Sequence, residues 1–245
     1  MQFSEAKYAL ARKLDINYDD IANNGLFSDA DLSSYIQEGL IRAWDYKPWP
    51  FSQAVKTATT IANTDYYDYP QDVMNGSIYL LRAGNKEYKK LLIEDYLRWF
   101  AVNPADSSRY WAETQTYIFI NKNAYSQGVD TFDLYGKAIA PNLTNPTDLL
   151  PFSPISDNEQ YSGNEAIIQL AYSEALDSEK KKNPQAAEVE RKKAYQSLDL
   201  LWKPFADTKA NSQPQRSLFN VPNYFPDYPN SRQSPIGNFN VPFWP

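Results

Sequence analysis

Two closely spaced prolines near residue 50 limit what this chain can fold into more than any other feature. Lys47 and Trp49 each precede a proline. A residue before proline is pushed out of the α region toward an extended conformation, so a helix cannot continue through this corner. The rings here, Trp44, Trp49 and Phe51, predict an apolar plug at the change of direction, with a stacking platform for sugars or bases as the alternative.

The residues after the corner read as a strand. In residues 53–62, β-branched side chains alternate with other residues, and this period of two is typical of a strand; they are Val55, Thr57, Thr59 and Ile61. A tyrosine- and aspartate-rich stretch follows. Pro70 ends the strand region, because proline is tolerated in a sheet only at an edge.

Before the corner, the pattern is helical. Residues 4–14 have apolar side chains at helical spacing, with Ser4 as a possible cap. A second helix is expected to open at Ser28 and to end near residues 44–46. Its apolar stripe predicts core contact, with a partner helix as the alternative: Leu32, Tyr35, Ile36, Leu40 and Ala43.

After residue 73 the sequence returns to strands. Residues 77–82 and 87–91 flank Gly84-Asn85 and predict a hairpin. Residues 93–100 switch to helical spacing and end at Asn103-Pro104. Two further strands are expected, at residues 116–120 and 131–135.

A helical hairpin is predicted near the C-terminal end. Ser162 and Glu165 fit a capping box for its first helix, and Asn183-Pro184 fits the start of its second. The expected buried sides are Ala166, Ile167, Leu170, Ala171 and Leu176 on the first helix and Ala187, Arg191, Ala194, Leu198 and Leu201 on the second. The short connection favours an antiparallel pair ending near Trp202.

Residues 206–245 differ from everything before them. They are rich in Pro, Asn and Ser and have no helical or strand periodicity, yet they contain many rings. A solvated tail is poor in aromatic residues, so we expect an extended arm that docks on a neighbouring subunit or partner, or alternatively wraps its own domain. The expected contact residues are Leu198, Trp202, Phe205, Phe219, Tyr224, Phe225, Tyr228, Phe239, Phe243 and Trp244.

Composition excludes several kinds of site. The chain has no Cys and no His, so Cys/His zinc sites, disulfides and Ser-His-Asp triads are ruled out. Neither phosphate-binding glycine motif occurs. The formal charge of −6 disfavours tight duplex binding, because that affinity comes from cationic side chains. No apolar run is long enough to span a membrane, and the first residues lack the apolar segment of a signal peptide.

Two groups of charged residues remain as candidates. Asp65, Asp68 and Asp72 could serve as acid and base in glycoside hydrolysis or bind Ca²⁺, but their spacing matches no defined loop, and solvent-facing carboxylates are the simpler interpretation. Residues 180–182 and 191–193 are basic. We interpret them as a solvated helix end and face, with weak DNA contact as the alternative.

The order of these features resembles the adaptor, or head-completion, proteins of tailed bacteriophages, which form the ring beneath the portal. The resemblance covers residues 28–203. The matching features are Trp49-Pro50-Phe51, Thr57 to Thr60, Tyr69-Pro70-Gln71-Asp72, the helix Leu91 to Phe100, Leu134-Tyr135-Gly136, Thr144 to Asp148, and the final helices with Tyr195 and Leu198. The arm after residue 205 matches no pattern of the family.

The resemblance implies a structural virion protein without catalytic residues or cofactors. It implies a homo-oligomeric ring of twelve copies at the head-tail interface, assembled after synthesis in the host cytoplasm. Its partners would be the portal and a tail or second neck protein, with genomic DNA only passing through and no membrane involved. The runner-up function is carbohydrate binding through a Tyr/Trp surface, and a carboxylate glycosidase is third.

The expected fold is α+β, with helical ends, an inserted antiparallel sheet and an extended C-terminal arm. Residues 1–205 are expected to form one domain. Within it, residues 1–46 supply the N-terminal helices, 52–140 the β-rich insertion and 155–205 the helical hairpin. Residues 206–245 form the arm.

Overall fold

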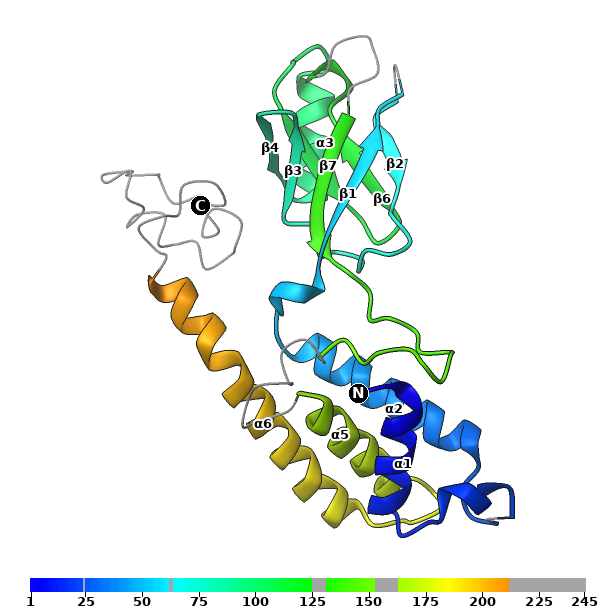
Figure 1. Ribbon diagram of the computed structural model, residues 1–245. Helices are drawn as coiled ribbons and strands as arrows, with labels where there is room; N and C mark the ends of the chain where they lie inside the picture. Colours follow the sequence, from blue (N-terminus) through cyan, green and yellow to red (C-terminus); the bar gives the residue numbers. More distant parts are fainter. Residues whose placement is uncertain (24, 62–63, 125–130, 153–162, 212–245) are drawn as a thin grey trace. The chain divides into compact units, whose positions relative to one another are not determined.

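The computed structural model describes residues 1–23, 25–61, 64–124, 131–152 and 163–211, with backbone alone for 207–211 (Figure 1). The fold is mixed α+β. Its contacts separate two compact units: a helical unit of residues 1–50 and 140–208, and a β unit of residues 51–139. The insertion limits lie within a residue of those expected from the sequence, but the expected single domain is divided into two compact units.

The helical unit contains four α-helices among its described residues. They are α1 (Phe3–Lys13), α2 (Asp29–Tyr46), α5 (Gly163–Asp177) and α6 (Pro184–Asn211), with a short 3-10 segment, η1 (Tyr18–Asn23). In Figure 1, α5 lies beside α2 and α6. None of the described helices is both long enough and apolar enough to cross a membrane.

Local hydrogen bonds set where these helices begin. Ser28 caps α2 as expected, and its hydroxyl accepts a hydrogen bond from the Asp31 backbone nitrogen at 3.2 Å. The expected Ser4 cap is wrong, because α1 begins one residue earlier and Gln2 is the cap, bonded through its backbone nitrogen to Glu5 at 2.7 Å. The predicted capping residue Ser162 lies outside the described residues.

Helix α5 is the centre of the helical unit. Its residues Ala166, Ile167, Leu170 and Ala171 are fully buried, as predicted. The predicted apolar stripe of α2 packs against it, and its fully buried residues are Leu32, Ile36, Leu40 and Ala43. Helix α6 is joined to α5 by a hydrogen bond from Gln169 to Glu190 and an ion pair between Arg191 and Glu174. The stripe is therefore core, and the partner-helix alternative for it is wrong.

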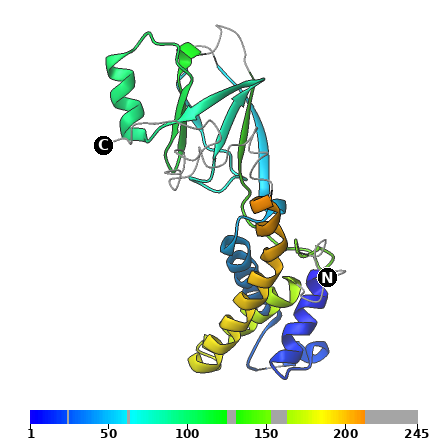
Figure 2. The ribbon, with the colours of Figure 1, turned by 90° about the vertical axis from the view of Figure 1, so that its left-hand side faces the viewer.

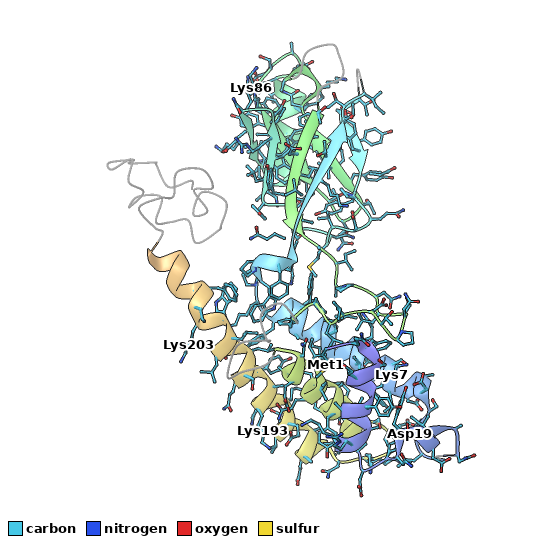
Figure 3. All side chains as sticks on the ribbon, in the orientation of Figure 1. Met1, Lys7, Asp19, Lys86, Lys193 and Lys203 are labelled. Atoms are coloured by element: carbon cyan, nitrogen blue, oxygen red, sulfur yellow. The ribbon has the colours of Figure 1, made fainter. Side chains whose placement is uncertain are left out.

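The close approach of α2 and α5 depends on Gly39. A Cβ atom at this position would lie 2.6 Å from the carbonyl oxygen of Ile167 and 2.9 Å from the backbone nitrogen of Ala171. Real Cβ atoms do not come this near to backbone atoms, so only glycine lets the two helices approach so closely. Lys7 further ties α1 to α2 through an ion pair with Asp29 at 2.9 Å (Figure 3).

The proline corner has the conformation expected of it. Helix α2 ends at Tyr46, and Lys47 is extended with φ −139° and ψ 157°. Trp44 and Trp49 are buried, and the Trp49 indole donates a hydrogen bond to the Ala43 carbonyl at 2.8 Å. Burial of both indoles favours the apolar plug over an exposed stacking platform at this corner.

Helix α6 is longer than the sequence pattern predicts. It contains Pro204 in its interior and continues to Asn211, so the expected end near Trp202 and an arm beginning at residue 206 are both wrong. Proline removes one backbone donor but leaves the other helical bonds available, and the favourable formers Ala206 and Lys209 follow it. The segment outside the described residues therefore begins at residue 212.

The short 3-10 segment η2 (Pro50–Ser52) spans the boundary between the units, and the β unit contains seven strands among its described residues. They are β1 (Gln53–Thr59), β2 (Tyr66–Asp68), β3 (Leu80–Ala83), β4 (Lys86–Lys90), β5 (Tyr110–Glu113), β6 (Tyr117–Ile120) and β7 (Thr131–Lys137). The unit also contains α3 (Ile93–Val102) and η3 (Lys122–Ala124). The sheet curls, with strand order β1-β7-β3-β4-β5-β6-β2 (Figures 1 and 2).

Most strands were predicted, but the pairing of one strand pair corrects the expectation of a purely antiparallel sheet. The β3–β4 hairpin turns at Gly84, whose φ of +56° suits glycine, as the Gly-Asn signal indicated. The sheet is not purely antiparallel, because β4 and β5 run parallel, with helix α3 in the connection between them. Sequence patterns missed the short strands β2 and β5.

The residues of β1 alternate between two faces as predicted, but the small residues face the core and the β-branched residues face away from it. Ala54 and Ala58 face the core cluster of the β unit, whereas Val55 is 55% exposed and Thr57 and Thr59 are exposed. The core itself is built from large side chains contributed by several strands, including Tyr69, Tyr88, Trp111, Ile118, Phe132 and Leu134. Small alanines on β1 leave room for these rings.

Candidate functional site

The structure places three of the expected contact residues, all on α6. Leu198 is fully buried in the helical unit, so its expected role as a contact residue is wrong: its side chain packs in the chain's own core. Trp202 and Phe205 are half-buried. The other seven lie outside the described residues: Phe219, Tyr224, Phe225, Tyr228, Phe239, Phe243 and Trp244.

Trp202 and Phe205 belong to a chain of rings, the α6-end cluster, defined by Trp49, Phe152, Trp202 and Phe205. The Trp49 ring meets Phe152 edge-on at 5.1 Å and Trp202 edge-on at 5.5 Å, and Trp202 lies 5.8 Å from Phe205. Trp49 and Phe152 are fully buried, so they hold the inner edge of the cluster. The half-buried outer rings leave apolar surface near the end of α6.

Polar contacts one to two turns earlier hold α6 against the end of α2. Tyr46 and Tyr195 lie 4.6 Å apart between ring centroids, and the Tyr46 hydroxyl donates to Asp199 at 3.0 Å. Lys47 pairs with Asp199 at 2.9 Å, and this hydrogen bond lowers the pKa of Asp199 below its usual range. These contacts orient the outer rings of the α6-end cluster.

A second collection of rings, which sequence reasoning missed, lies on the β unit. We call Tyr66, Tyr96, Phe100, Tyr117 and Phe119 the aromatic face. Their ring centroids form a continuous series, with Tyr66–Tyr117 at 5.7 Å, Tyr66–Phe119 at 6.5 Å, Phe119–Tyr96 at 6.1 Å and Tyr96–Phe100 at 6.2 Å. The rings come from β2, β6 and α3.

Some rings of the aromatic face are buried in the core of the β unit, and others are exposed at its surface. Tyr96 is 2% exposed and anchors α3, whereas Tyr66 is 55% and Tyr117 is 41% exposed. Adjacent exposed rings of this kind are enriched at interaction sites, because they combine apolar area with a polar tip. The signal was present in residues 117–120, where Tyr, Ile, Phe and Ile make both sides of a strand apolar.

The hydroxyl of Tyr96 has no hydrogen-bond partner among the described residues. Its pKa is raised, first by burial and then by the nearby charge of Asp65. A buried hydroxyl without a partner carries a cost in stability. The neutral phenol is therefore strongly favoured at this position.

The three candidate carboxylates do not form a site. Asp72 is exposed and pairs with Lys56, whose hydrogen bond lowers the pKa of Asp72. Asp68 is exposed on β2, and Asp65 is half-buried just before that strand. Within the described ranges no three acidic side chains gather into a possible metal site. The geometry thus favours solvent-facing carboxylates over a metal-binding or glycosidase triad.

The basic cluster of residues 191–193 is largely neutralised by neighbouring acids, and in the cluster 180–182 Lys180 pairs with Asp31. Arg191 is bonded to Glu174 at 3.3 Å, and Glu188 pairs with both Arg191 and Lys192. Lys193, on the outer side of α6 in Figure 3, pairs with Glu190 at 2.6 Å. This pairing supports the interpretation of residues 191–193 as a helix face within the hairpin, and it weakens the alternative of DNA contact.

A shallow polar depression of about 330 Å³ lies where α1 meets η1. The ring centroids of Tyr8 and Tyr18 lie 4.3 Å apart in this depression, and the Tyr8 hydroxyl donates a hydrogen bond to Asp19 at 2.7 Å. The rest of the lining is Arg12, Asp15, Ile16 and Asn17. The hydroxyls of Tyr8 and Tyr18 are already bonded to carboxylates, Asp19 and Asp29, so the depression contributes to the packing of α1 rather than presenting a catalytic arrangement.

Comparison of the chain with protein-family models and with curated proteins finds no match. Any functional assignment therefore depends on the residues themselves and on the two ring surfaces, the α6-end cluster and the aromatic face.

Proposed function

We propose that this chain is a structural protein of a tailed-bacteriophage virion, an adaptor that joins the portal to the tail and continues the DNA channel. The order of sequence features from residue 28 to 203 supports this assignment. The geometry adds one observation that carries it further: α6, a helix of 28 residues, leads from a buried helical core to the half-buried Trp202 and Phe205. The ring-rich segment, residues 212–245, follows the end of α6 in the sequence.

The finer arrangement belongs to this proposal. Helices from both ends of the chain form the part that grips the portal, and the inserted β unit faces neighbouring copies or the tail. The C-terminal arm, residues 212–245, continues from α6 and docks its rings on a neighbour or partner. The pairing of α5 with α6 through Gln169–Glu190 at 2.9 Å and Arg191–Glu174 supports a rigid base for such an arm.

The assembly we propose is a ring of twelve copies at the head-tail interface, assembled from chains made in the host cytoplasm. Its partners are the portal protein and a tail or second neck protein, and genomic DNA only passes through. The formal charge of −6 suits a conduit, because like charge keeps DNA from adhering to the wall.

Native mass spectrometry of the full chain, alone and mixed with the portal protein of the same phage, tests this proposal. We expect a complex that contains adaptor copies in the symmetry of the portal. A chain that stays monomeric with the portal present overturns the adaptor assignment.

Variants of the arm locate the contact. Replacing Phe225, Phe243 and Trp244 together by Ser should abolish the portal complex, because buried rings dominate interface energies. The matched control replaces the exposed Val189 of α6 by Ser, which should leave the complex intact. An unchanged complex with the triple variant contradicts the proposed role of the arm.

The exposed tyrosines of the aromatic face favour a second candidate, carbohydrate binding. Tyr66 and Tyr117 meet edge-on, with ring planes at 84°, so their faces do not form one flat platform. Retardation in polysaccharide affinity gels is the test. Retardation that disappears in Tyr66→Thr supports sugar binding, and equal mobility with and without polysaccharide eliminates it.

A further inference from the structure

The segment after α6 contains a repeated motif. Residues 219–222 and 239–242 both read Phe-Asn-Val-Pro, 20 positions apart. Each is followed closely by two adjacent rings and a proline, as Tyr224-Phe225-Pro226 and as Phe243-Trp244-Pro245. These residues lie outside the described ranges, so the argument about them uses their sequence alone. Two matching motifs in one short segment indicate two ligands for the same kind of surface.

The chemistry of the motif indicates which surface it fits. A residue that precedes proline generally favours an extended conformation, and such a preference lowers the entropy lost when a segment docks. Proline-containing extended segments dock on surfaces lined with aromatic side chains. The flanking rings of each motif supply the apolar anchors that such a contact needs.

The aromatic face of the β unit has the complementary properties. Tyr66 and Tyr117 are its exposed rings, on the neighbouring antiparallel strands β2 and β6. Asp65 and Asp68 flank this position on the chain, whereas residues 212–245 contain two arginines against one aspartate. Charge therefore favours contact between the segment and the face.

We propose that the two Phe-Asn-Val-Pro motifs are equivalent ligands, each able to dock on the aromatic face of a second copy of this chain. The proposal deepens the proposed function, since a ring places copies side by side. Each chain has two motifs but one aromatic face, so its own face cannot hold both. Twelve residues separate Pro226 from Phe239 and span up to about 40 Å, enough to reach separate copies.

Sedimentation velocity of the full chain, without any portal protein, tests this proposal over a range of about 1–500 µM. If the two motifs are equivalent ligands, changing one of them should have a much smaller effect than changing both. Phe219→Ser or Phe239→Ser alone should weaken self-association only about twofold, the statistical factor for losing one of two ligands, whereas the double variant should abolish it. Complete loss from one single variant, or no association of the unaltered chain, overturns the proposal.

The acceptor side has its own variants. Tyr66→Thr combined with Tyr117→Thr should weaken self-association at least about tenfold, because it removes both exposed rings, while threonine, like tyrosine, favours the strand conformation. Changing both residues to Phe should preserve association, and Val102→Ser, at a 74% exposed position on the same unit, is the matched control. Equal association of the Thr variant and the control places the acceptor elsewhere and overturns the proposal.

Photo-crosslinking separates docking between copies from docking within one chain. A benzophenone side chain is placed at position 219 or 239, and ¹⁴N- and ¹⁵N-labelled chains are mixed. The proposal requires mixed-isotope crosslinks from both positions to the peptide that contains Tyr66 or Tyr117. Crosslinks within one isotope alone, or to different surfaces from the two positions, overturn it.

These outcomes are distinguishable from failure of the proposed function. Self-association through the motifs without portal binding would leave the inference standing and remove the adaptor assignment. Conversely, the copies could fail to associate through this face while portal binding is unaffected by Tyr66→Thr and Tyr117→Thr. That result would remove the inference and leave the adaptor assignment standing.

Discussion

The helical unit and the β unit bury their cores in different ways. In the helical unit, the contact between α2 and α5 uses small and aliphatic side chains, and at Gly39 the two helix backbones meet with no side chain between them. The β unit packs large rings, such as Trp111, Tyr88 and Phe132, behind a curled sheet. Small side chains allow two helices to pack closely, whereas the rings of the β unit continue to its surface at Tyr66 and Tyr117.

A nearly buried carboxylate links distant segments in each unit. In the helical unit, Glu174 is 11% exposed and accepts hydrogen bonds from Arg42 at 2.9 Å and Arg191 at 3.3 Å. In the β unit, Glu113 is 9% exposed and bonds to Lys90 and to the Tyr69 hydroxyl. Both tie distant segments together, so the units differ in apolar packing more than in their ionic links.

The largest expected effect comes from removing a ring in the β unit. Trp111 is fully buried, and its indole donates to the Tyr88 carbonyl at 3.1 Å. Trp111→Ala should cost about 3–5 kcal/mol of unfolding free energy, through lost burial and a cavity. Hydrogen exchange read by mass spectrometry should show loss of protection in β3–β7 with α2 and α5 still protected. Equal loss in both units would mean that they unfold as one.

The helical unit should respond most to an added methyl group. Gly39→Ala forces α2 and α5 apart and should cost about 1–3 kcal/mol, the range for overpacked cores. Hydrogen exchange should then change in α2 and α5 while the β unit keeps its protection. The control is Ala30→Gly at the exposed start of α2, which adds no bulk. Unchanged exchange in Gly39→Ala would contradict the close contact.

A matched pair of substitutions compares the ionic links. Glu174→Gln and Glu113→Gln keep the side-chain volume but remove the charge, leaving cationic donors without their best acceptor. Each should cost about 1–2 kcal/mol. Urea denaturation followed by exchange in each unit measures both. If Glu113→Gln lowers the unfolding free energy much more than Glu174→Gln does, the two ionic links are not similar in strength.

The smallest effect is a pH dependence confined to the helical unit. A hydrogen bond from Lys180, with capping bonds from Ser28, lowers the pKa of Asp31 to about 2. The folded pKa lies below the usual value, so this contribution is complete above about pH 4 and is lost as the pH falls toward 2. Thermal midpoints across this window should fall less steeply in Asp31→Asn than in the unaltered chain. If the thermal midpoints of the variant and of the unaltered chain fall equally steeply with pH, Asp31 does not cause this pH dependence.

Much of the fold followed from the sequence, because its signals were local. The Ser28 cap, the Gly84 turn and the Asn183 cap, which accepts a hydrogen bond from Ala186 at 3.2 Å, each depend on hydrogen bonds or backbone angles within a few residues. The proline corner at Lys47 is local in the same way, since the restriction arises from adjacent atoms. Helical periodicity located the buried faces of α2, α5 and α6 for the same reason.

The tertiary structure decided what depends on distant partners. The short strands β2 and β5 exist because β6 and β4 pair with them, and the parallel pairing of β4 with β5 has no local signal. The continuation of α6 past Pro204 overrides a breaker that local reasoning took as an end. Whether β-branched residues of β1 face the core was likewise settled by the rings across the sheet.

The candidate surfaces divide along the same line. Trp202 and Phe205 could be selected from the sequence, because they lie near the end of a predicted helix and precede a ring-rich segment. Leu198 could not be separated from them, since helical spacing does not tell a buried face from a contact face. The aromatic face assembles residues 66, 96, 100, 117 and 119 from three elements, and only the folding of α3 and the pairing of β2 with β6 bring those rings together.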